Sequence, residues 1–189
     1  PAVTIETWYT PVGGTNTGFT MLAYFGGTSG TIGVNYFMMS SAREDNFSRA
    51  AITVGDTDAP WGDEAGANGT EYDDNVQHHM AAKIDDTHIY LYIDGQLVNS
   101  VPLSDEVLSG VAQTMAALGK GGYSGDPEWH GSFQEFRIYN SAISTLQVFL
   151  NNQLGPEKYE QTALLTMSPA NNTANVSRDP TDLVWTADP

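Results

Sequence analysis

The chain has 189 residues, with 7 Lys and Arg against 23 Asp and Glu and a formal net charge of −16. A surface this acidic repels nucleic acid and anionic membranes, so neither is an expected partner. No apolar run approaches the ~20 residues of a membrane-spanning helix, which excludes membrane insertion, and the lack of cysteine excludes disulfides.

The N-terminal part of the chain predicts short strands joined by turns. Along residues 3–11, Ile5 and Thr7 face one way and Glu6 and Trp8 the other, a pattern typical of a half-buried strand. Three further strands are predicted at residues 19–25, which Gly26-Gly27 ends, at 31–39 and at 47–54.

Residues 55–75 interrupt this pattern. They are rich in Gly, Asp, Glu and Asn, with Trp61 and Tyr72 as isolated aromatic residues. The segment is predicted to be a long acidic loop, and loops longer than about 12–15 residues are uncommon and often functional.

The strongest local signal is a meander over residues 77–103. Strands are predicted at 77–84, 88–93 and 96–103, and Ile89 and Leu91 are expected on the opposite face from Tyr90 and Tyr92. Asp94-Gly95 predicts a two-residue type I′ turn, because both central positions of that turn need positive φ.

The C-terminal part of the predicted domain ends in a short helix. The elements before it are a strand at residues 114–118, a Gly-rich loop at 120–127 and a strand at 132–139. Ser144 as N-cap and Gln147 three residues later form a capping box, and Gly155-Pro156 ends the helix.

Several motifs in this order resemble one family. They are Ile5-Glu6-Thr7-Trp8, His78-His79-Met80-Ala81, Leu91-Tyr92-Ile93-Asp94-Gly95 and Phe136-Arg137-Ile138-Tyr139-Asn140. With them the chain resembles the laminin-G-like domains of the concanavalin A-like lectin/glucanase superfamily, over residues 3–154. The resemblance implies an all-β fold, a two-sheet antiparallel jelly-roll sandwich with one short C-terminal helix.

The resemblance also implies a domain organisation. Residues 1–156 are expected to form the laminin-G-like domain, without the strand region that usually precedes the Ile-Glu-x-Trp segment. Residues 157–189 are expected to be a linker and a partial second β-domain, similar to the start of an immunoglobulin-like or fibronectin-III-like module.

Catalytic residues are not evident in the sequence. Glucanases of this superfamily carry Glu-x-Asp-x-x-Glu on one strand, and here the nearest match, Glu71-Tyr72-Asp73, has Val76 in place of the third acid. There is no Cys nucleophile and no Gly-x-Ser-x-Gly elbow. The chain is therefore predicted not to be an enzyme.

Three functions remain in order of preference. The first is a non-catalytic binding or adhesion module of a secreted or cell-surface, bacterial multidomain protein that recognises a glycan or a protein. The second is a structural subunit of an extracellular assembly, completed by neighbouring chains at unpaired strand edges. A jelly-roll glycoside hydrolase is the third.

Ligand-binding candidates are aromatic residues that lie beside polar ones, because a glycan site combines an apolar platform with a few hydrogen-bonding groups. The candidates are Trp61, Asp63, Asn68, Tyr72, Tyr123, Asp126 and Trp129. For Trp61 and Trp129 the alternative is that the indole fills an end of the sandwich core.

Calcium is the candidate cofactor, with no cofactor as the alternative, because calcium prefers carboxylate and carbonyl oxygens in acidic, Gly-rich loops. The candidate ligands are Asp56, Asp58, Asp73 and Asp74. The superfamily often uses an Asp of the closing strand, and Gln134 stands at that position. His78 and His79 face opposite sides of a strand, so they cannot form one chelate, and the resemblance makes them structural.

Overall fold

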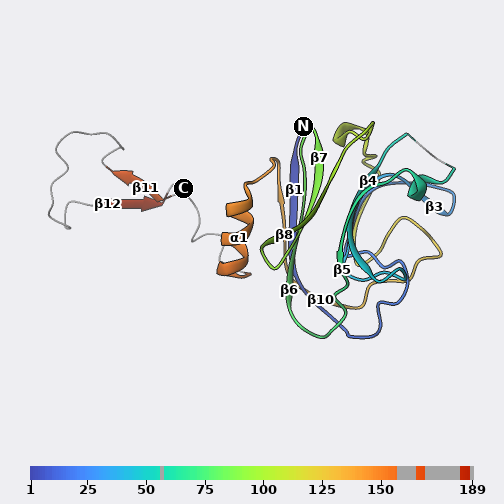
Figure 1. Ribbon diagram of the computed structural model, residues 1–189, viewed down its shortest axis with the longest axis horizontal. Coiled ribbons are helices and arrows are strands. Elements are labelled where there is room, and N and C mark those ends of the chain that lie inside the picture. Colours follow the sequence, from blue (N-terminus) through green and yellow to red (C-terminus); the bar gives the residue numbers. More distant parts are fainter. Residues whose placement is uncertain (56–57, 157–164, 169–183, 188–189) are drawn as a thin grey trace.

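The computed structural model describes residues 1–55, 58–156, 165–168 and 184–187. Two five-stranded antiparallel sheets pack face to face (Figure 1). The first sheet consists, in order, of β10 (Gly131–Tyr139), β1 (Val3–Pro11), β6 (His78–Ile84), β7 (His88–Ile93) and β8 (Gln96–Pro102). The second consists of β5 (Ala65–Thr70), β4 (Phe47–Thr53), β3 (Ile32–Ser40), β2 (Ala23–Ser29) and β9 (Met115–Leu118). The predicted two-sheet antiparallel sandwich is confirmed.

The short helix α1 (Thr145–Leu154) lies against the side of the first sheet that faces away from the second sheet (Figure 1). The Ser144 hydroxyl accepts a hydrogen bond from the Gln147 backbone N–H at 3.1 Å, which confirms the N-cap. The Gln147 side chain bonds instead to Asn151 Oδ1 at 2.7 Å, so only half of the predicted capping box forms. Gly155, with φ 78°, ends the helix.

Strand β7 shows how the sequence pattern builds the core. Ile89 and Leu91 point into the core between the sheets, whereas Tyr92 packs with Val148 of α1 on the other face. Asp94 and Gly95 both have positive φ, 49° and 77°, as the predicted type I′ turn requires. The meander is therefore confirmed in both its facing and its turn.

Strand β1 is buried on both faces, so the prediction of a half-buried strand is wrong. Ile5 belongs to the core between the sheets, and Glu6 and Trp8 on the opposite face are buried as well. The reason is tertiary, because β1 is an inner strand of its sheet and Asn151 of α1 contacts Glu6.

Two other predictions in the second sheet need correction. Strand β2 begins at Ala23 and continues through Gly26-Gly27 to Ser29, with a register shift between Phe25 and Gly27. Residues 55–75 are not one loop, since they contain the 3₁₀ turn η1 (Pro60–Gly62) and strand β5, which pairs with β4. The small residues of β5 carry little strand propensity, and pairing with β4 decides their conformation.

The remaining described elements are the 3₁₀ turn η2 (Leu108–Gly110) and a two-stranded antiparallel sheet of β11 (Leu165–Ser168) and β12 (Val184–Ala187). The predicted linker and partial second β-domain at residues 157–189 otherwise lie outside the described residues. Its immunoglobulin-like or fibronectin-III-like character stays a prediction.

Candidate functional site

The outer face of the second sheet, turned away from the core, carries large side chains. Along β3, Phe37 and Met39 point into the core, so Tyr36 and Met38 point outward. The Tyr123 ring, from the Gly-rich loop, meets Tyr36 edge-on with ring centroids 5.9 Å apart. Together they line a pocket of about 480 Å³ on this face, which we call the outer-face pocket.

An exposed indole stands at the rim of the outer-face pocket. Trp61 lies in η1, where the buried Pro60 fixes the start of the turn, and 56% of its surface is exposed. Its ring centroid lies 6.0 Å from that of Tyr123, in an edge-to-face arrangement. The rim therefore offers an aromatic surface beside the opening.

An ion pair is fixed at the base of the pocket. Arg49 of β4 donates from Nε to Glu64 Oε2 at 2.8 Å and from Nη1 to Asn68 Oδ1 at 2.6 Å. The Glu64 side chain is 5% exposed and that of Arg49 15%. Arg49 lies opposite Asn68 in the register of β4 and β5, so the sheet itself sets this geometry.

Two tyrosine hydroxyls extend this network. Tyr123 donates to the Tyr36 hydroxyl at 3.0 Å, and Tyr36 donates to Glu64 Oε1. Burial, and then the Glu64 charge, raises the pKa of Tyr36 well above its usual value, and burial chiefly raises the pKa of Tyr123 to about 12. Both hydroxyls keep their protons at neutral pH, so Glu64 is held as an acceptor.

A glycine makes room for Arg49. A Cβ at Gly66 would lie 2.1 Å from the guanidinium carbon of Arg49, far inside contact distance. Gly66 is on β5, next but one to Asn68, and faces the pocket side of the sheet. A side chain here would displace Arg49, which explains a residue that otherwise weakens a strand.

The pocket lining also contains a second arginine, Arg43, and a half-buried acid, Asp126. Arg43 donates from Nη2 to Asp45 at 3.2 Å, and its guanidinium carbon lies 5.0 Å from the centre of the Phe19 ring. Burial raises the pKa of Asp126, which also lines the pocket, although Lys120 and Arg43 oppose this rise. The pocket thus combines hydrogen-bond donors and acceptors with apolar walls.

The predicted ligand-binding residues separate into two groups. Trp61, Tyr123 and Asp126 line the outer-face pocket, and Asn68 supports it through Arg49. The other three lie outside its lining: Asp63 is exposed at the end of η1, Tyr72 packs on the His78 ring at 4.4 Å, and Trp129 is in the core.

Trp129 does not offer an exposed platform. It is 6% exposed, lies in the core near Tyr9 and Phe133, and donates from Nε1 to Ser41 Oγ at 3.0 Å. Of the two alternatives for Trp129, filling of the core is therefore the one that the structure supports.

Three of the four predicted calcium ligands, Asp58, Asp73 and Asp74, lie within the described residues. Asp56 lies outside the described residues. Asp73 accepts hydrogen bonds from the Asn16 side chain and backbone at 2.8 and 3.1 Å, and Asp74 bonds to His78 at 3.2 Å. Within the described residues, no three His, Cys, Asp or Glu are grouped to hold a metal ion. Asp73 and Asp74 thus fix loops through these bonds, and calcium binding stays a prediction.

Sequence reasoning did not identify the polar base of the pocket. Arg49 lies on β4 and Glu64 directly before β5, and the pairing of these two strands brings the side chains together. The scarcity of basic residues could have pointed to it. Of the seven Lys and Arg residues in the chain, two, Arg43 and Arg49, line this pocket.

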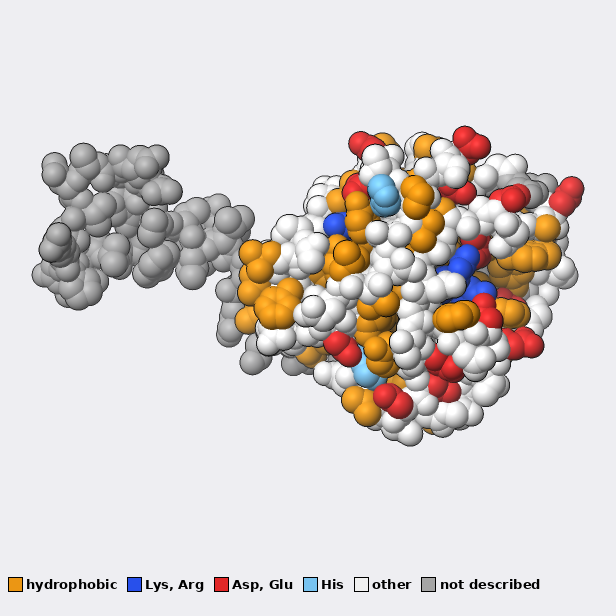
Figure 2. All heavy atoms as spheres, viewed as in Figure 1, with side chains coloured by type: hydrophobic (Ala, Val, Ile, Leu, Met, Phe, Trp, Pro, Cys, Tyr) orange, Lys and Arg blue, Asp and Glu red, His pale blue; other side chains and the backbone are white. Residues whose placement is uncertain are grey.

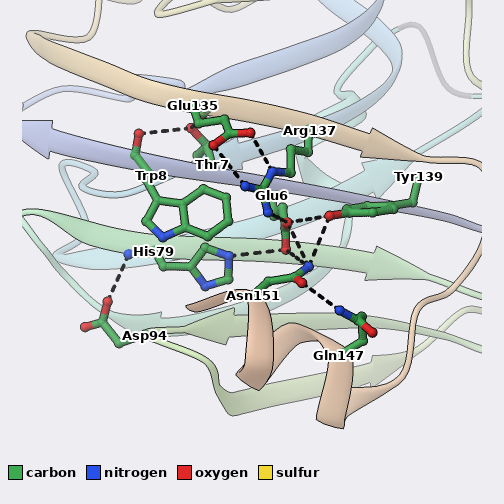
Figure 3. Close-up of polar contacts among 10 residues, drawn as sticks. All are labelled: Glu6, Thr7, Trp8, His79, Asp94, Glu135, Arg137, Tyr139, Gln147 and Asn151. Atoms are coloured by element: carbon green, nitrogen blue, oxygen red, sulfur yellow. Dashed lines mark hydrogen bonds and ion pairs between the residues drawn. The ribbon is translucent and has the colours of Figure 1, made fainter. Parts of the chain in front are cut away.

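A second cluster of titratable groups lies under helix α1 (Figure 3). The buried Glu6 accepts hydrogen bonds from Tyr139 at 2.6 Å, from Arg137 at 3.1 Å and from Asn151 at 2.9 Å, and its other oxygen lies 3.3 Å from His79 Nε2. Glu6 is fully buried, so no ligand reaches it. The cluster ties α1 to β1, β6 and β10 and is structural.

The surface agrees with the composition of the chain. Acidic side chains are scattered over the face shown in Figure 2, where basic side chains are few. In the described part of the chain, no helix is long and apolar enough to cross a membrane.

Comparison with known proteins gave matches of family and of fold. The family model of the concanavalin A-like lectin/glucanases superfamily matches residues 2–149. Among solved structures, CBM40 of the Ruminococcus gnavus IT-sialidase, bound to α2,6-sialyllactose, has a TM-score of 0.63 at 15% identity over 79% of this chain and 82% of that chain.

Two further structures share the fold. Domain 4 of AbnA, a GH43 extracellular arabinanase from Geobacillus stearothermophilus in complex with arabinotriose, has a TM-score of 0.57 at 18% identity over 78% of this chain and 64% of that chain. A leech intramolecular trans-sialidase has a TM-score of 0.65 at 15% identity over 87% of this chain and 25% of that chain. A search of curated proteins gave no match.

Proposed function

Because the chain belongs to the concanavalin A-like lectin/glucanases superfamily, we propose that it is a non-catalytic glycan-binding module that works outside the cell, as part of a secreted or cell-surface protein. Its ligand is a sugar residue held in the outer-face pocket. One observation carries the proposal: the exposed Trp61 stands beside Tyr123 at the rim of a pocket of about 480 Å³ whose base holds the fixed pair Arg49–Glu64.

The chemistry of this pocket suits a sugar. A sugar ring has an apolar C–H face, which the negative π-face of an indole attracts, and an edge of hydroxyl groups. Each hydroxyl both donates and accepts hydrogen bonds, so it needs partners of both kinds. Arg49 and Arg43 supply donors, and Glu64 and Asp126 supply acceptors, within one pocket.

The similar folds support a carbohydrate ligand only in general terms. The R. gnavus and G. stearothermophilus structures contain sialyllactose and arabinotriose. At 15% and 18% identity they share the fold with this chain. One fold hosts many functions, so the residues of the pocket carry the proposal.

A catalytic role has weaker support. Glu71 and Asp73, the nearest approach to a glucanase motif, lie after β5 and outside any strand, and both Asp73 oxygens bond to Asn16. The pocket lining contains three carboxylates, Asp45, Glu64 and Asp126, and a hydrolase would need two of them to flank the scissile bond. Release of reducing ends from β-glucans, galactans or arabinans, lost on Asp126→Asn, would replace the binding role with hydrolysis.

The direct test is a glycan array followed by calorimetry on the full chain and on Trp61→Ala. A Trp side chain buries about 200 Å² when fully covered. With 56% of Trp61 exposed, a stacked sugar covers roughly half of that exposed area, or about 55 Å². At ~25 cal/mol per Å² this is worth ~1.4 kcal/mol, so we expect about tenfold weaker binding.

The matched control for this test is Leu146→Ala, which truncates another exposed apolar side chain on α1, outside the pocket. It should bind the glycan as the unaltered protein does. A blank array, or equal affinity of Trp61→Ala and the unaltered protein, would contradict the proposal. Self-assembly, the structural alternative, stays a prediction that light scattering tests directly.

A further inference from the structure

The two arginines of the outer-face pocket are already engaged by the protein. Arg49 and Arg43 are the basic residues of its lining, and each donates to a carboxylate that also lines it, Glu64 and Asp45 respectively. A sugar carboxylate entering the pocket would have to compete with these acids for the same cations.

The hydrogen bonds that Arg49 already makes limit how it could bind a ligand carboxylate. A guanidinium binds a carboxylate best through two parallel N–H groups, either Nε with Nη2 or Nη1 with Nη2. Arg49 Nε donates to Glu64 and its Nη1 donates to Asn68, at 2.8 and 2.6 Å. The face formed by Nε and Nη2 has therefore lost its Nε–H to Glu64, and one of the two N–H groups of Nη1 is committed to Asn68. The remaining N–H groups suit single hydrogen bonds to hydroxyl groups.

Arg43 is restricted in a similar way. Its Nη2 donates to Asp45 at 3.2 Å, and its Nε is a buried atom without a hydrogen-bond partner among the described residues. The buried Nε makes the face formed by Nε and Nη2 poorly accessible to a ligand carboxylate, and on the face formed by Nη1 and Nη2 the carboxylate of Asp45 already occupies one N–H of Nη2.

The charge of the pocket acts in the same direction. Its lining contains two arginines against the three acids Asp45, Glu64 and Asp126. The pocket lies in a chain with a formal charge of −16, so the wider field also repels anions. A neutral sugar avoids this repulsion and can bridge an arginine and the acid beside it with adjacent hydroxyls.

We infer that the outer-face pocket selects a neutral sugar residue with adjacent hydroxyl groups and rejects sugars that carry a carboxylate. This specificity rests on the proposed glycan-binding function. It distinguishes the chain from the similarly folded sialidase CBM40, which was solved with sialyllactose.

The test compares matched neutral and acidic probes with the full chain: lactose against sialyllactose, and galactotriose against trigalacturonate, beside neutral arabino-, xylo- and gluco-oligosaccharides. The best probe should be neutral and at least about tenfold tighter than any acidic one, with affinity that changes little with salt. Tighter binding of an acidic probe would overturn the inference and leave glycan binding intact. No binding of any probe would overturn both.

Two variants with the same net charge distinguish the effect of the pocket's own residues from the effect of the chain's overall negative charge. Asp45→Asn frees Arg43 at the pocket, and Asp105→Asn removes one exposed acid outside it. We expect Asp45→Asn, but not Asp105→Asn, to reduce the ratio of neutral-probe affinity to acidic-probe affinity by about threefold. This is the size of effect expected when one partner of an exposed ion pair is removed. If Asp105→Asn reduces the ratio equally, or if Asp45→Asn leaves it unchanged, the pocket does not set the specificity.

Discussion

Replacing Glu6 by Gln should destabilise the sandwich strongly, because Glu6 is the buried acceptor of the cluster under α1 (Figure 3). One of its oxygens accepts from Arg137, Tyr139 and Asn151 at 3.1, 2.6 and 2.9 Å. The other accepts from Asn151 at 3.1 Å. Gln keeps one acceptor but turns an NH₂ group toward the Asn151 amide.

The magnitude follows from the burial of this cluster. Breaking a buried ion pair by removing one partner costs ~3–5 kcal/mol. Gln retains the shape of Glu6, and Arg137 keeps its contacts with Glu135 at 2.6 and 2.9 Å. We therefore expect the lower end, about 3 kcal/mol. In a domain of this size that loss corresponds to a fall in Tm of ~6–12 °C.

Urea unfolding at several pH values gives a second readout. Burial alone would raise the pKa of Glu6, but hydrogen bonds from its neighbours, His79 first, outweigh burial and lower it. A lowered folded pKa contributes stability above the unfolded pKa of about 4.3, and this contribution is lost as pH falls through the folded value. The difference in free energy of unfolding between the unaltered protein and Glu6→Gln should therefore be largest at pH 7 and become smaller in acid.

The control is Glu44→Gln, which removes an exposed carboxylate. It should change the free energy of unfolding by less than ~0.5 kcal/mol. If Glu6→Gln also stays within that range, or if its difference from the unaltered protein grows as pH falls, the assignment of Glu6 as the charged centre of the cluster is wrong.

Three further predictions concern other residues. Gly66→Ala, whose methyl would meet the Arg49 guanidinium at 2.1 Å, should displace this flexible side chain from its hydrogen bonds, lower stability by ~0.5–1.5 kcal/mol and weaken glycan binding in calorimetry, whereas Gly62→Ala, with open space around it, should do neither. Burial would lower the pKa of His78, but hydrogen bonds to Asp94 and Asp74 outweigh it and raise the pKa. Its contribution to stability is thus full below pH ~6.5 and lost as pH rises through the raised folded value, and urea titrations of His78→Gln should lack this slope. For the predicted calcium binding, we expect a higher Tm in excess calcium than after EDTA treatment. Equal Tm values in the two conditions would refute it.

Part of the candidate site could be predicted from the local composition of single segments of the sequence. Trp61, Tyr123 and Asp126 lie in Gly- and Asp-rich stretches, and the structure places all three at one pocket. Trp129 has the same kind of neighbours in sequence, yet it is buried in the core. Local composition cannot separate these two environments, because burial depends on which strands surround the residue.

The sequence by itself determined the elements whose signal is local. Alternation predicted β7 and its facing, Asp94-Gly95 predicted the turn, and Ser144 predicted the start of α1. In each case the deciding interaction spans only a few residues, so periodicity and turn chemistry are sufficient.

Tertiary structure alone decided the rest. It made β5 a strand through its pairing with β4, buried the polar face of β1 under α1, and joined Arg49 to Glu64 at the base of the pocket. These outcomes depend on contacts between distant segments. Such contacts leave no periodic pattern in the sequence. The cost of burying the charged groups of Glu6 and Arg49 is offset by hydrogen-bond partners that only the folded chain brings to them.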